Sequence, residues 1–445
     1  MKNFISVESG LIIANHMSVD YNLPTMGVRK PQKFYGWWVV VASAVCLFTA
    51  YGFGFYPLTV AFKDIQGEFE VSRGMLSGAI AIFGIITAIG FLFAGRFCDK
   101  FGAPRVMRVS VPLVGLGIIL VGLTQNVVQL YAAFAIYSVG LSGVSLVPIN
   151  VLVSMWFGDK RGRAVGLLSA GVSLGGFGGP LVSSFLLTRF GWRPMFWVLG
   201  LAAWGLLVPL VVWIMKTPPR ATKSGTACVD PSLTNTKTIS FSFGASFTLR
   251  QALGTSTFWL QASALFLVSS VWVAVLSHTP NFLRDGGLSP GQAALGLGLA
   301  SAMGIWAKPL SGFLSDRLSR VGLFLGFVLF QAVGVFLLTR MQGGASTFLA
   351  LTILGIGGGG EVPLSPLLTS QFFGNLQFGA VFGALELAYA LGGAIGPLVA
   401  GWVYDQTGSY LMAFFLFLAA YVVAIGSYCI AYYTRPKSKV ALQNS

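Results

Sequence analysis

Three ionisable side chains lie within long apolar runs of this chain, and a fourth lies near the end of such a run. They are Lys308, Glu361, Glu386 and His278. A charge at the centre of a bilayer costs about 2.5 to 3.5 kcal/mol on insertion scales, so ionisable residues there usually face a bundle interior or a water-filled cavity. These four residues are therefore candidates for ligand binding or proton transfer.

Lys308 has the chemistry to hold an anion. An ammonium group attracts a carboxylate more strongly in a low-dielectric cavity than in water. However, Lys308 lies one helical turn from Gly312, so its side chain could instead extend to the membrane surface or be paired structurally. The sequence favours anion binding and leaves the second interpretation open.

Glu361 has the chemistry to take up a proton or a cation. It follows the glycines Gly357–Gly360 and precedes Pro363 and Pro366, so the helix is expected to bend or break beside its carboxylate. Burial in such a place allows a carboxylate to be protonated near neutral pH. Glu361 could equally serve only to neutralise Lys308.

Further polar and aromatic side chains are candidates to line a substrate cavity together with Lys308 and His278. They are Asn150, Tyr137, Trp306 and Tyr389, and also Tyr51, Tyr56 and Tyr131. Most such residues in a helix bundle serve packing or the interfacial aromatic belt, and His278 too could be interfacial. Glu386 is a second candidate for proton coupling, unless it faces the lateral surface of its helix.

Other chemistries are not indicated. The chain has no phosphate-cradling Gly-Lys-Ser/Thr motif, so ATP-driven transport is not expected. The four cysteines have neither pairing nor metal-type spacing, so we expect no disulfide framework, no metal site and no cofactor. An integral-membrane enzyme would need a clustered catalytic set, and the sequence does not provide one.

The elements that position these residues are twelve long apolar runs. Of the 445 residues, 55% are hydrophobic and 9% are charged, whereas a soluble globular chain has roughly 25% charged residues. Because a spanning helix needs roughly 20 apolar residues, the chain is expected to be an all-α polytopic membrane protein. The predicted spans lie near 35–62, 72–95, 105–124, 128–157, 161–189, 193–215, 256–283, 290–314, 320–341, 346–373, 377–404 and 410–433. The polar stretch 216–255 is expected to be a linker.

Basic residues lie almost entirely between the runs, and mostly on one side of the predicted membrane. With both termini on that side, it holds 21 of the 28 Lys and Arg residues, and the other side holds six. Since cytoplasmic loops carry the excess of Lys and Arg, we expect the tails 1–33 and 435–445 and the linker to be cytoplasmic, in a cytoplasmic (inner) membrane. The same distribution explains the net charge of +15 without a nucleic-acid partner. The first 33 residues lack the long apolar core of a signal peptide.

The two sets of six runs repeat one another. Gly95–Lys100 (GRFCDK) recurs as Gly312–Arg317 (GFLSDR), and Leu174–Val182 recurs as Leu391–Val399 at the same offset. At that offset Gly162, Gly166 and Gly191 match Gly379, Gly383 and Gly408. One constant offset across four motifs predicts two halves of parallel topology, 34–215 and 256–434, as in a duplicated six-helix unit.

The motif Gly-x-x-x-Asp-(Lys/Arg), present in both halves, resembles the loop motif of the major facilitator superfamily of transporters. The resemblance covers nearly all of residues 34–434. It implies two pseudo-symmetric six-helix bundles around a central cavity, and alternating access by rocking of the bundles. It also implies a cytoplasmic gating motif, whose residues here are Gly95, Asp99, Arg105, Gly312, Asp316, Arg317, Arg161 and Arg163.

Asp99 and Asp316 end helices at the predicted cytoplasmic face. A helix N-terminus attracts negative charge, so we expect Asp316 to contact the start of the fifth span near Arg161 and Arg163. By the same argument, Asp99 should contact the start of the eleventh span near Gln377. Such contacts would hold the cytoplasmic side shut. The alternative is that these charges only mark helix ends and orientation.

Within this superfamily the chain looks most like the monocarboxylate porter and oxalate/formate antiporter branch. The similar segments are Tyr35–Trp38, Trp156–Phe157 with Lys160–Gly162, and Asp405–Tyr410. Ala307–Gly312 is similar to the Ala-Arg-Pro-Ser-x-Gly stretch in which monocarboxylate porters place a substrate-binding Arg, and Lys308 is the matching position. The chain departs from that pattern twice, because a Lys lacks the bidentate fork of Arg and because Gly304 replaces an expected acidic partner.

Gly166, Gly175 and Gly179-Pro180 also look like a motif of drug and proton antiporters. Its second copy at Gly383, Gly392 and Gly396-Pro397 favours an architectural role, since small residues let helices approach closely. We therefore expect a secondary active transporter that moves a small organic anion, a mono- or dicarboxylate, by proton symport or exchange for a counter-anion. It is expected to work as a monomer in the lipid bilayer. A drug or hydrophobic-compound proton antiporter and a non-transporting membrane sensor stay open as alternatives.

Overall fold

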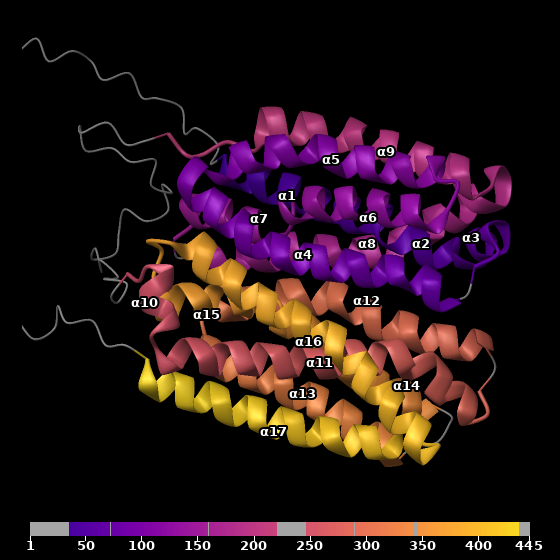
Figure 1. Ribbon diagram of the computed structural model, residues 1–445. Coiled ribbons are helices and arrows are strands. Elements are labelled where there is room, and N and C mark those ends of the chain that lie inside the picture. The colour runs from indigo at the N-terminus through magenta and orange to yellow at the C-terminus, as the bar shows by residue number, and fades with distance from the viewer. Residues whose placement is uncertain are drawn as a thin grey trace, which may run out of the picture.

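The computed structural model of this chain describes residues 35–71, 73–158, 160–219, 246–288, 290–340 and 345–435. All regular elements of the described part are helices, and Figure 1 shows them side by side in two bundles, one indigo to magenta and the other pink through orange to yellow. The predicted all-α class is therefore confirmed. The tails 1–33 and 436–445 and most of the predicted linker lie outside the described residues.

The first half consists of nine helices and one π-helical turn, of which the short α3 lies between the first and second predicted spans. They are α1 (Gly36–Gly54), α2 (Tyr56–Val60), α3 (Phe62–Phe69), α4 (Arg73–Phe101), α5 (Ala103–Leu123), α6 (Val127–Ser142), α7 (Leu146–Trp156), α8 (Arg161–Phe190), α9 (Trp192–Pro209) and η1 (Leu210–Ile214). The first span is divided before Pro57, which lies in the first turn of α2, where its missing N–H is tolerated. The fourth span is divided at Gly143–Ser145, between α6 and α7.

The second half repeats this arrangement with eight helices. They are α10 (Leu249–Leu253), α11 (Ser256–Asp285), α12 (Pro290–Ser315), α13 (Arg320–Arg340), α14 (Ala345–Glu361), α15 (Leu364–Phe373), α16 (Phe378–Thr407) and α17 (Leu411–Thr434). The tenth span is divided between Glu361 and Leu364, at Pro363, so the predicted helix break beside Glu361 is present.

One short helix, α10, lies within the stretch that the sequence predicts to be a polar linker. Thr248 and Gln251 form a capping box at its start, which satisfies backbone donors of this single turn. Leu249 and Ala252 are buried, and the Phe247 N–H donates to the Phe373 carbonyl at 2.9 Å. The end of the predicted linker is therefore packed onto the second half.

Eleven helical segments of the described chain are long and apolar enough to cross a membrane. Among the predicted spans, only the eighth is absent from this set. It corresponds to α12, which carries Lys308. Because α12 packs against α8 and α14 over most of its length, it is the twelfth long helix of the fold.

Both halves begin and end at one end of the bundle, which we call the tail end. The Tyr35 hydroxyl donates to the Ile214 carbonyl at 3.1 Å, which joins the start of α1 to the end of η1. Thr257 and Thr434 hydroxyls lie 3.4 Å apart, which joins the start of α11 to the end of α17. Figure 1 shows α10 and these helix ends on the left. That the tail end faces the cytoplasm stays a prediction.

The glycines of the repeated Gly-Pro segments mediate packing within each half. Gly179 approaches the backbone of Gly52, so that a Cβ at 179 would lie 2.4 Å from the Gly52 carbonyl oxygen. In the second half, a Cβ at Gly396 would lie 1.9 Å from the Ser270 carbonyl oxygen. These contacts join α8 to α1 and α16 to α11, which supports the architectural interpretation of the motif.

Candidate functional site

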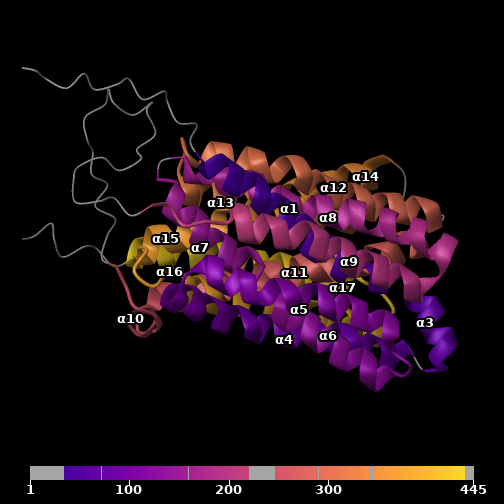
Figure 2. The ribbon, with the colours of Figure 1, turned by 90° about the horizontal axis from the view of Figure 1, so that it is seen from above.

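The two halves meet along two helix pairs, α4 with α16 and α8 with α12. Figure 1 shows α4 beside α16, and Figure 2, turned by 90°, shows α8 beside α12. The repeat relates the two pairs to each other, because α4 corresponds to α12 and α16 to α8. Site residues on these four helices therefore lie where the two halves meet.

At the tail end, Asp316 contacts the first turn of α8. Its Oδ1 accepts a hydrogen bond from the Gly162 N–H at 2.8 Å, and its Oδ2 accepts one from the Arg163 N–H at 3.2 Å. The Arg163 Nε lies 3.4 Å from the same Oδ2. Burial raises the pKa of the Asp316 carboxyl above its usual range, while these hydrogen bonds act in the opposite direction. This is the contact predicted from the sequence.

Asp99 makes the equivalent contact with the first turn of α16. Its Oδ1 accepts a hydrogen bond from the Gly379 N–H at 3.0 Å, and its Oδ2 accepts one from the Ala380 N–H at 2.7 Å. Both carboxylates thus cap a helix of the opposite half at the same two positions of its first turn, where unpaired N–H groups attract negative charge. We call these two contacts the latches.

Close glycine contacts bring the latched helices together. A Cβ at Gly95 would lie 2.0 Å from the Gly379 carbonyl oxygen, and a Cβ at Gly312 would lie 2.3 Å from the Gly162 carbonyl oxygen. Such distances exclude any side chain without a shift of the backbone. The two halves are therefore in direct backbone contact at the tail end, which is closed in this structure.

The basic residues predicted for the gating motif differ in their environments. Arg161 is 4% exposed, and its NH1 donates to the Ser370 Oγ of the other half at 2.7 Å. Arg317 lies over the Phe313 ring, 4.6 Å from its centroid. Arg105 is exposed and donates to the Phe101 carbonyl at 3.3 Å, away from both latches.

Lys308 lies deeper in the bundle and is buried at the contact between the halves. Only 7% of the residue is exposed, and its Nζ donates to the Ser173 Oγ of α8 at 2.6 Å. Among the described residues, no carboxylate lies within 4.0 Å of this ammonium. The Lys308 ammonium therefore donates a hydrogen bond to a hydroxyl of the opposite half, and no close carboxylate among the described residues neutralises its positive charge.

Gly304, one turn before Lys308, explains why no acidic partner occupies that position. A Cβ at 304 would lie 2.7 Å from the Ser173 Oγ, and a Cβ at Gly359 would lie 2.6 Å from the Gly304 Cα. Three helices, α8, α12 and α14, thus converge on this point. A carboxylate side chain there would displace Ser173, the hydrogen-bond partner of Lys308.

Glu361 ends α14 and is 1% exposed. The Tyr389 hydroxyl of α16 donates to its Oε1 at 3.4 Å. Ser311, one turn after Lys308, donates to the Gly360 carbonyl, which fixes the end of α14 to α12. Glu361 is thus an electrostatic neighbour of Lys308, although the two do not form a close ion pair.

Glu386 lies one helical turn before Tyr389 on α16 and is 8% exposed, so it faces the bundle and not its lateral surface. It is an electrostatic neighbour of both Glu361 and Tyr51, which is on α1 of the other half. Asn150 is 1% exposed, and its Oδ1 has no hydrogen-bond partner in the described part of the chain. Glu386 thus brings the buried carboxyl groups of the second half close to Tyr51 of the first half.

Three further predicted site residues make contacts that do not involve Lys308 or the buried carboxyl groups. Trp306 is 77% exposed and, two residues before Lys308, is on the opposite face of α12. Tyr137 is 1% exposed and donates to the Ala50 carbonyl at 2.6 Å, within the core of the first half. His278 bridges the Tyr410 hydroxyl at 3.2 Å and the Pro397 carbonyl at 3.0 Å, so it joins helices of the second half.

Sequence reasoning missed Ser173, the hydrogen-bond partner of Lys308. Its hydroxyl is one of many in the spans, and the equivalent position of the repeat in the second half is Ala390, so neither periodicity nor symmetry marks it. The contact exists because α8 and α12 approach closely at Gly304. Pairing of this kind depends on tertiary packing.

Comparisons with known proteins agree with this arrangement. The sequence profile described as Major Facilitator Superfamily matches residues 44–373 and 284–445. The oxalate:formate antiporter of Oxalobacter formigenes is 26% identical over 414 residues, covering 91% of this chain and 94% of the relative. Monocarboxylate transporter 2 of Homo sapiens is 25% identical over 413 residues, covering 87% and 84%. The crystal structure of the transporter FucP in the outward conformation aligns with a TM-score of 0.64 at 17% identity, covering 88% of this chain and 99% of that one.

Proposed function

Because the chain belongs to the Major Facilitator Superfamily, we propose that it is a secondary active transporter that carries a small organic anion across the cytoplasmic membrane. We infer that the anion is a mono- or dicarboxylate. Formate and oxalate, for which one relative is named, are carboxylates, and a second relative is named for monocarboxylates. Both relatives match this chain over most of its length.

The observation that carries this proposal is the environment of Lys308. Its ammonium is buried where α8 and α12 meet, and its hydrogen-bond partner is the neutral hydroxyl of Ser173. A buried charge without a counter-ion is unfavourable, and an incoming carboxylate would supply that counter-ion in a low-dielectric place. Substrate binding would therefore neutralise Lys308 and stabilise the occupied transporter.

We assign proton coupling to the buried carboxyl groups of the second half. Glu361 is buried beside Tyr389 and near Lys308, and Glu386 lies one turn away on α16. A proton on Glu361 would leave Lys308 free to bind the substrate, which describes proton symport. If Glu361 does not exchange its proton, the charge of Lys308 must be balanced by an anion in both directions, which describes anion exchange.

Closing and release of the latches would control alternating access. When Asp99 and Asp316 cap the opposite helices, the tail end is closed, so a substrate would have to reach Lys308 from the other end. Release of both carboxylates would let the halves rock apart at the tail end. The glycine contacts at Gly95 and Gly312 would separate in the same movement.

The test is uptake of radiolabelled formate, oxalate and larger carboxylates into proteoliposomes, with and without an inward proton gradient. We expect saturable uptake by the native chain and its loss in Lys308→Ala. Lys63→Ala is the matched control, because Lys63 is exposed at the end of the bundle opposite the tail end. Carboxylate uptake that persists in Lys308→Ala would remove Lys308 from the site. Absence of carboxylate uptake in the native chain, with proton-driven export of hydrophobic cations, would favour the drug antiporter.

A further inference from the structure

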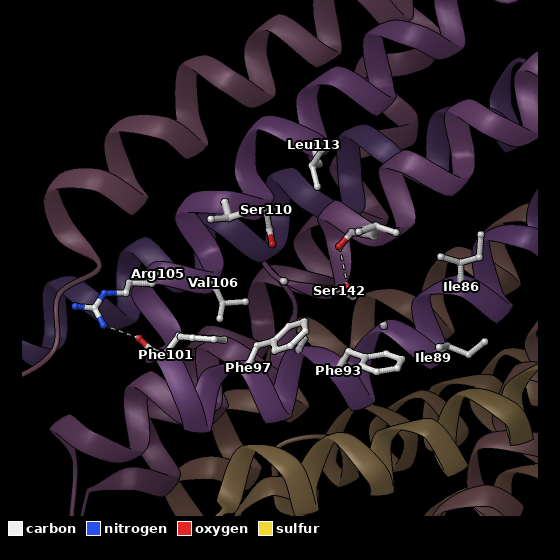
Figure 3. Close-up of a pocket in the computed structure, with 15 residues that line it drawn as sticks. Ile86, Ile89, Phe93, Phe97, Phe101, Arg105, Val106, Ser110, Leu113 and Ser142 are labelled. Carbon is white, nitrogen blue, oxygen red and sulfur yellow. Dashed lines mark hydrogen bonds between the residues drawn. The ribbon is translucent and has the colours of Figure 1, made fainter.

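A cavity lies on the lateral surface of the first half, and Lys308 does not line it. It has a volume of about 620 Å³ and lies between α4, α5 and α6 (Figure 3). Figure 3 shows Phe93, Phe97 and Phe101 in a row along α4, facing Val106 and Leu113 of α5. We call this cavity the lateral groove. It contains none of the residues of the candidate transport site.

Small residues form the floor of the lateral groove. A Cβ at Gly90 would lie 2.6 Å from the Ser142 Cβ, and a Cβ at Gly143 would lie 1.9 Å from the Ser110 Oγ. The three helices therefore approach closely at this floor, while the long side chains of α4 and α5 stand out on both sides. The lateral groove is thus formed by the way in which α4, α5 and α6 pack together.

The outer walls of the lateral groove are apolar and open to the bilayer. Phe93, Phe97 and Phe101 are each nearly half exposed, and Val109 is 71% exposed. Exposed apolar walls in a spanning region are covered by lipid chains, and apolar binding cavities of several hundred Å³ bury most of a ligand. The occupant must therefore have a long apolar part.

Charge is confined to the tail end of the lateral groove. Arg105 lines this end, as Figure 3 shows, and its guanidinium is exposed beside Phe101. Lys100 and Arg108, which precede and follow Arg105 in the sequence, are also exposed. The position equivalent to Arg105 in the second half is Gly322, so the repeated fold does not itself require a basic residue there.

We propose that the lateral groove binds one anionic phospholipid from the leaflet at the tail end, with an acyl chain along α4 and α5 and the phosphate at Arg105. A phospholipid combines the apolar length that the walls need with a negative group at one end, where the basic side chains lie. Lys and Arg at a membrane surface favour anionic lipids by about 1 kcal/mol each, or roughly fivefold in affinity. An uncharged solute would provide no negative group for Arg105.

Lipid in the lateral groove would also contact the gating machinery. The row of phenylalanines is on α4, the helix that carries Gly95 and Asp99 on its other face. A bound lipid would therefore stabilise the position of α4 relative to α5. This role does not depend on which solute is transported.

The test is native mass spectrometry of the full chain with phosphatidylglycerol and phosphatidylcholine of identical acyl chains. We expect one retained phosphatidylglycerol and a preference for it over phosphatidylcholine that falls roughly fivefold in Arg105→Gln. Arg108→Gln is the matched control, because Arg108 is exposed on the same helix and does not line the groove. An equal loss in both variants would overturn the proposal, since it would show general attraction to a basic surface.

A second pair of variants tests the apolar part. Val109→Trp fills the lateral groove without touching the core and should reduce retention of both lipids, whereas Val128→Trp, at a valine that is 70% exposed outside the groove, should not. Unchanged retention in Val109→Trp would place the lipid elsewhere. Retention of phosphatidylcholine equal to that of phosphatidylglycerol, or a dimer in place of the lipid adduct, would also reject the proposal.

Discussion

At the scale of single residues, the central feature is the ammonium of Lys308, which is buried against a hydroxyl and has no close carboxylate among the described residues. Removal of a partner from a buried ion pair usually destabilises a protein, because a charge is left uncompensated. Here the sequence itself places Gly304 where a partner would stand. The charge that a substrate is proposed to neutralise is therefore maintained by the absence of one side chain.

Gly304→Asp should restore an internal partner for Lys308 and abolish uptake of carboxylates. Gly304→Asn has nearly the same size without the charge, so it controls for the clash with Ser173 that any side chain at 304 would cause. We expect measurable uptake by the Asn variant and none by the Asp variant, in proteoliposomes matched for protein content. Equal uptake by both variants would show that packing at 304, and not charge at Lys308, limits transport.

Glu361→Gln should separate substrate binding from proton coupling. The amide keeps the shape and can still accept the hydrogen bond of Tyr389, but it cannot take up or release a proton. We expect the stimulation of uptake by an inward proton gradient to disappear while exchange of internal for external carboxylate continues. Glu386→Gln is measured in parallel. Gradient stimulation that survives in Glu361→Gln and disappears in Glu386→Gln would move the coupling site to α16.

At the scale of elements, the sequence predicts the long helices well, because each is an apolar run bounded by charge, Pro or Gly. It also predicts the break beside Glu361, since Pro363 leaves a helix without an N–H at that point. The short helices α3 and α10 are not marked by such runs. They depend on local caps and on contacts with distant loops, which periodicity does not contain.

The attachment of α3 illustrates such a contact and predicts a pH dependence. The Glu68 Oε2 accepts a hydrogen bond from the Trp192 indole at 2.6 Å, and its Oε1 accepts one from the Arg193 NH2 at 2.7 Å. The hydrogen bond from Arg193 lowers the pKa of Glu68 below its usual value. A lowered pKa means that this attachment is present above the ordinary Glu value of about 4.3 and is lost as pH falls through the lowered pKa.

The mobility of a spin label at Gly67→Cys, in a background without the native cysteines, measures this attachment. Position 67 has open space around it, so the label itself should not disturb α3. We expect low mobility from neutral pH down to about 4 and a rise below that. In Glu68→Gln the mobility should be high at every pH. A label that is equally immobile in both proteins at neutral pH would show that apolar contacts alone hold α3.

At the scale of the whole molecule, the duplicated sequence predicts two halves and two latches, and the structure contains both contacts. Symmetry makes this possible, because one carboxylate and one helix start recur at a constant offset. The set of side chains around Lys308 is less symmetric. Ser173, Gly304 and Glu361 have no chemically equivalent partners in the other half, so their association follows only from how the halves pack.

The two latches are related by symmetry but differ in their surroundings. Asp316 has a side chain that is 6% exposed and an added ion pair with Arg163, whereas Asp99 is an exposed residue. Hydrogen bonds to a charged group contribute about 1.5 to 3 kcal/mol when they are protected from water, and less at an exposed site. Asp316→Asn should therefore shift the halves toward opening at the tail end by roughly 10- to 150-fold, and Asp99→Asn by less.

A variant that combines Asp99→Asn with Asp316→Asn tests whether the two halves move as rigid bodies. If one movement breaks both latches, the two shifts in free energy should add within about 0.5 kcal/mol, because the carboxylates share no partner. Spin labels at Gly158→Cys in the first half and Leu318→Cys in the second, both exposed at the tail end, report the separation of the halves by pulsed dipolar spectroscopy. We expect a longer distance to gain population in the order Asp99→Asn, Asp316→Asn, double variant. If the double variant opened no further than Asp316→Asn alone, Asp99 would only mark a helix end, and the tail end would be closed by a single latch.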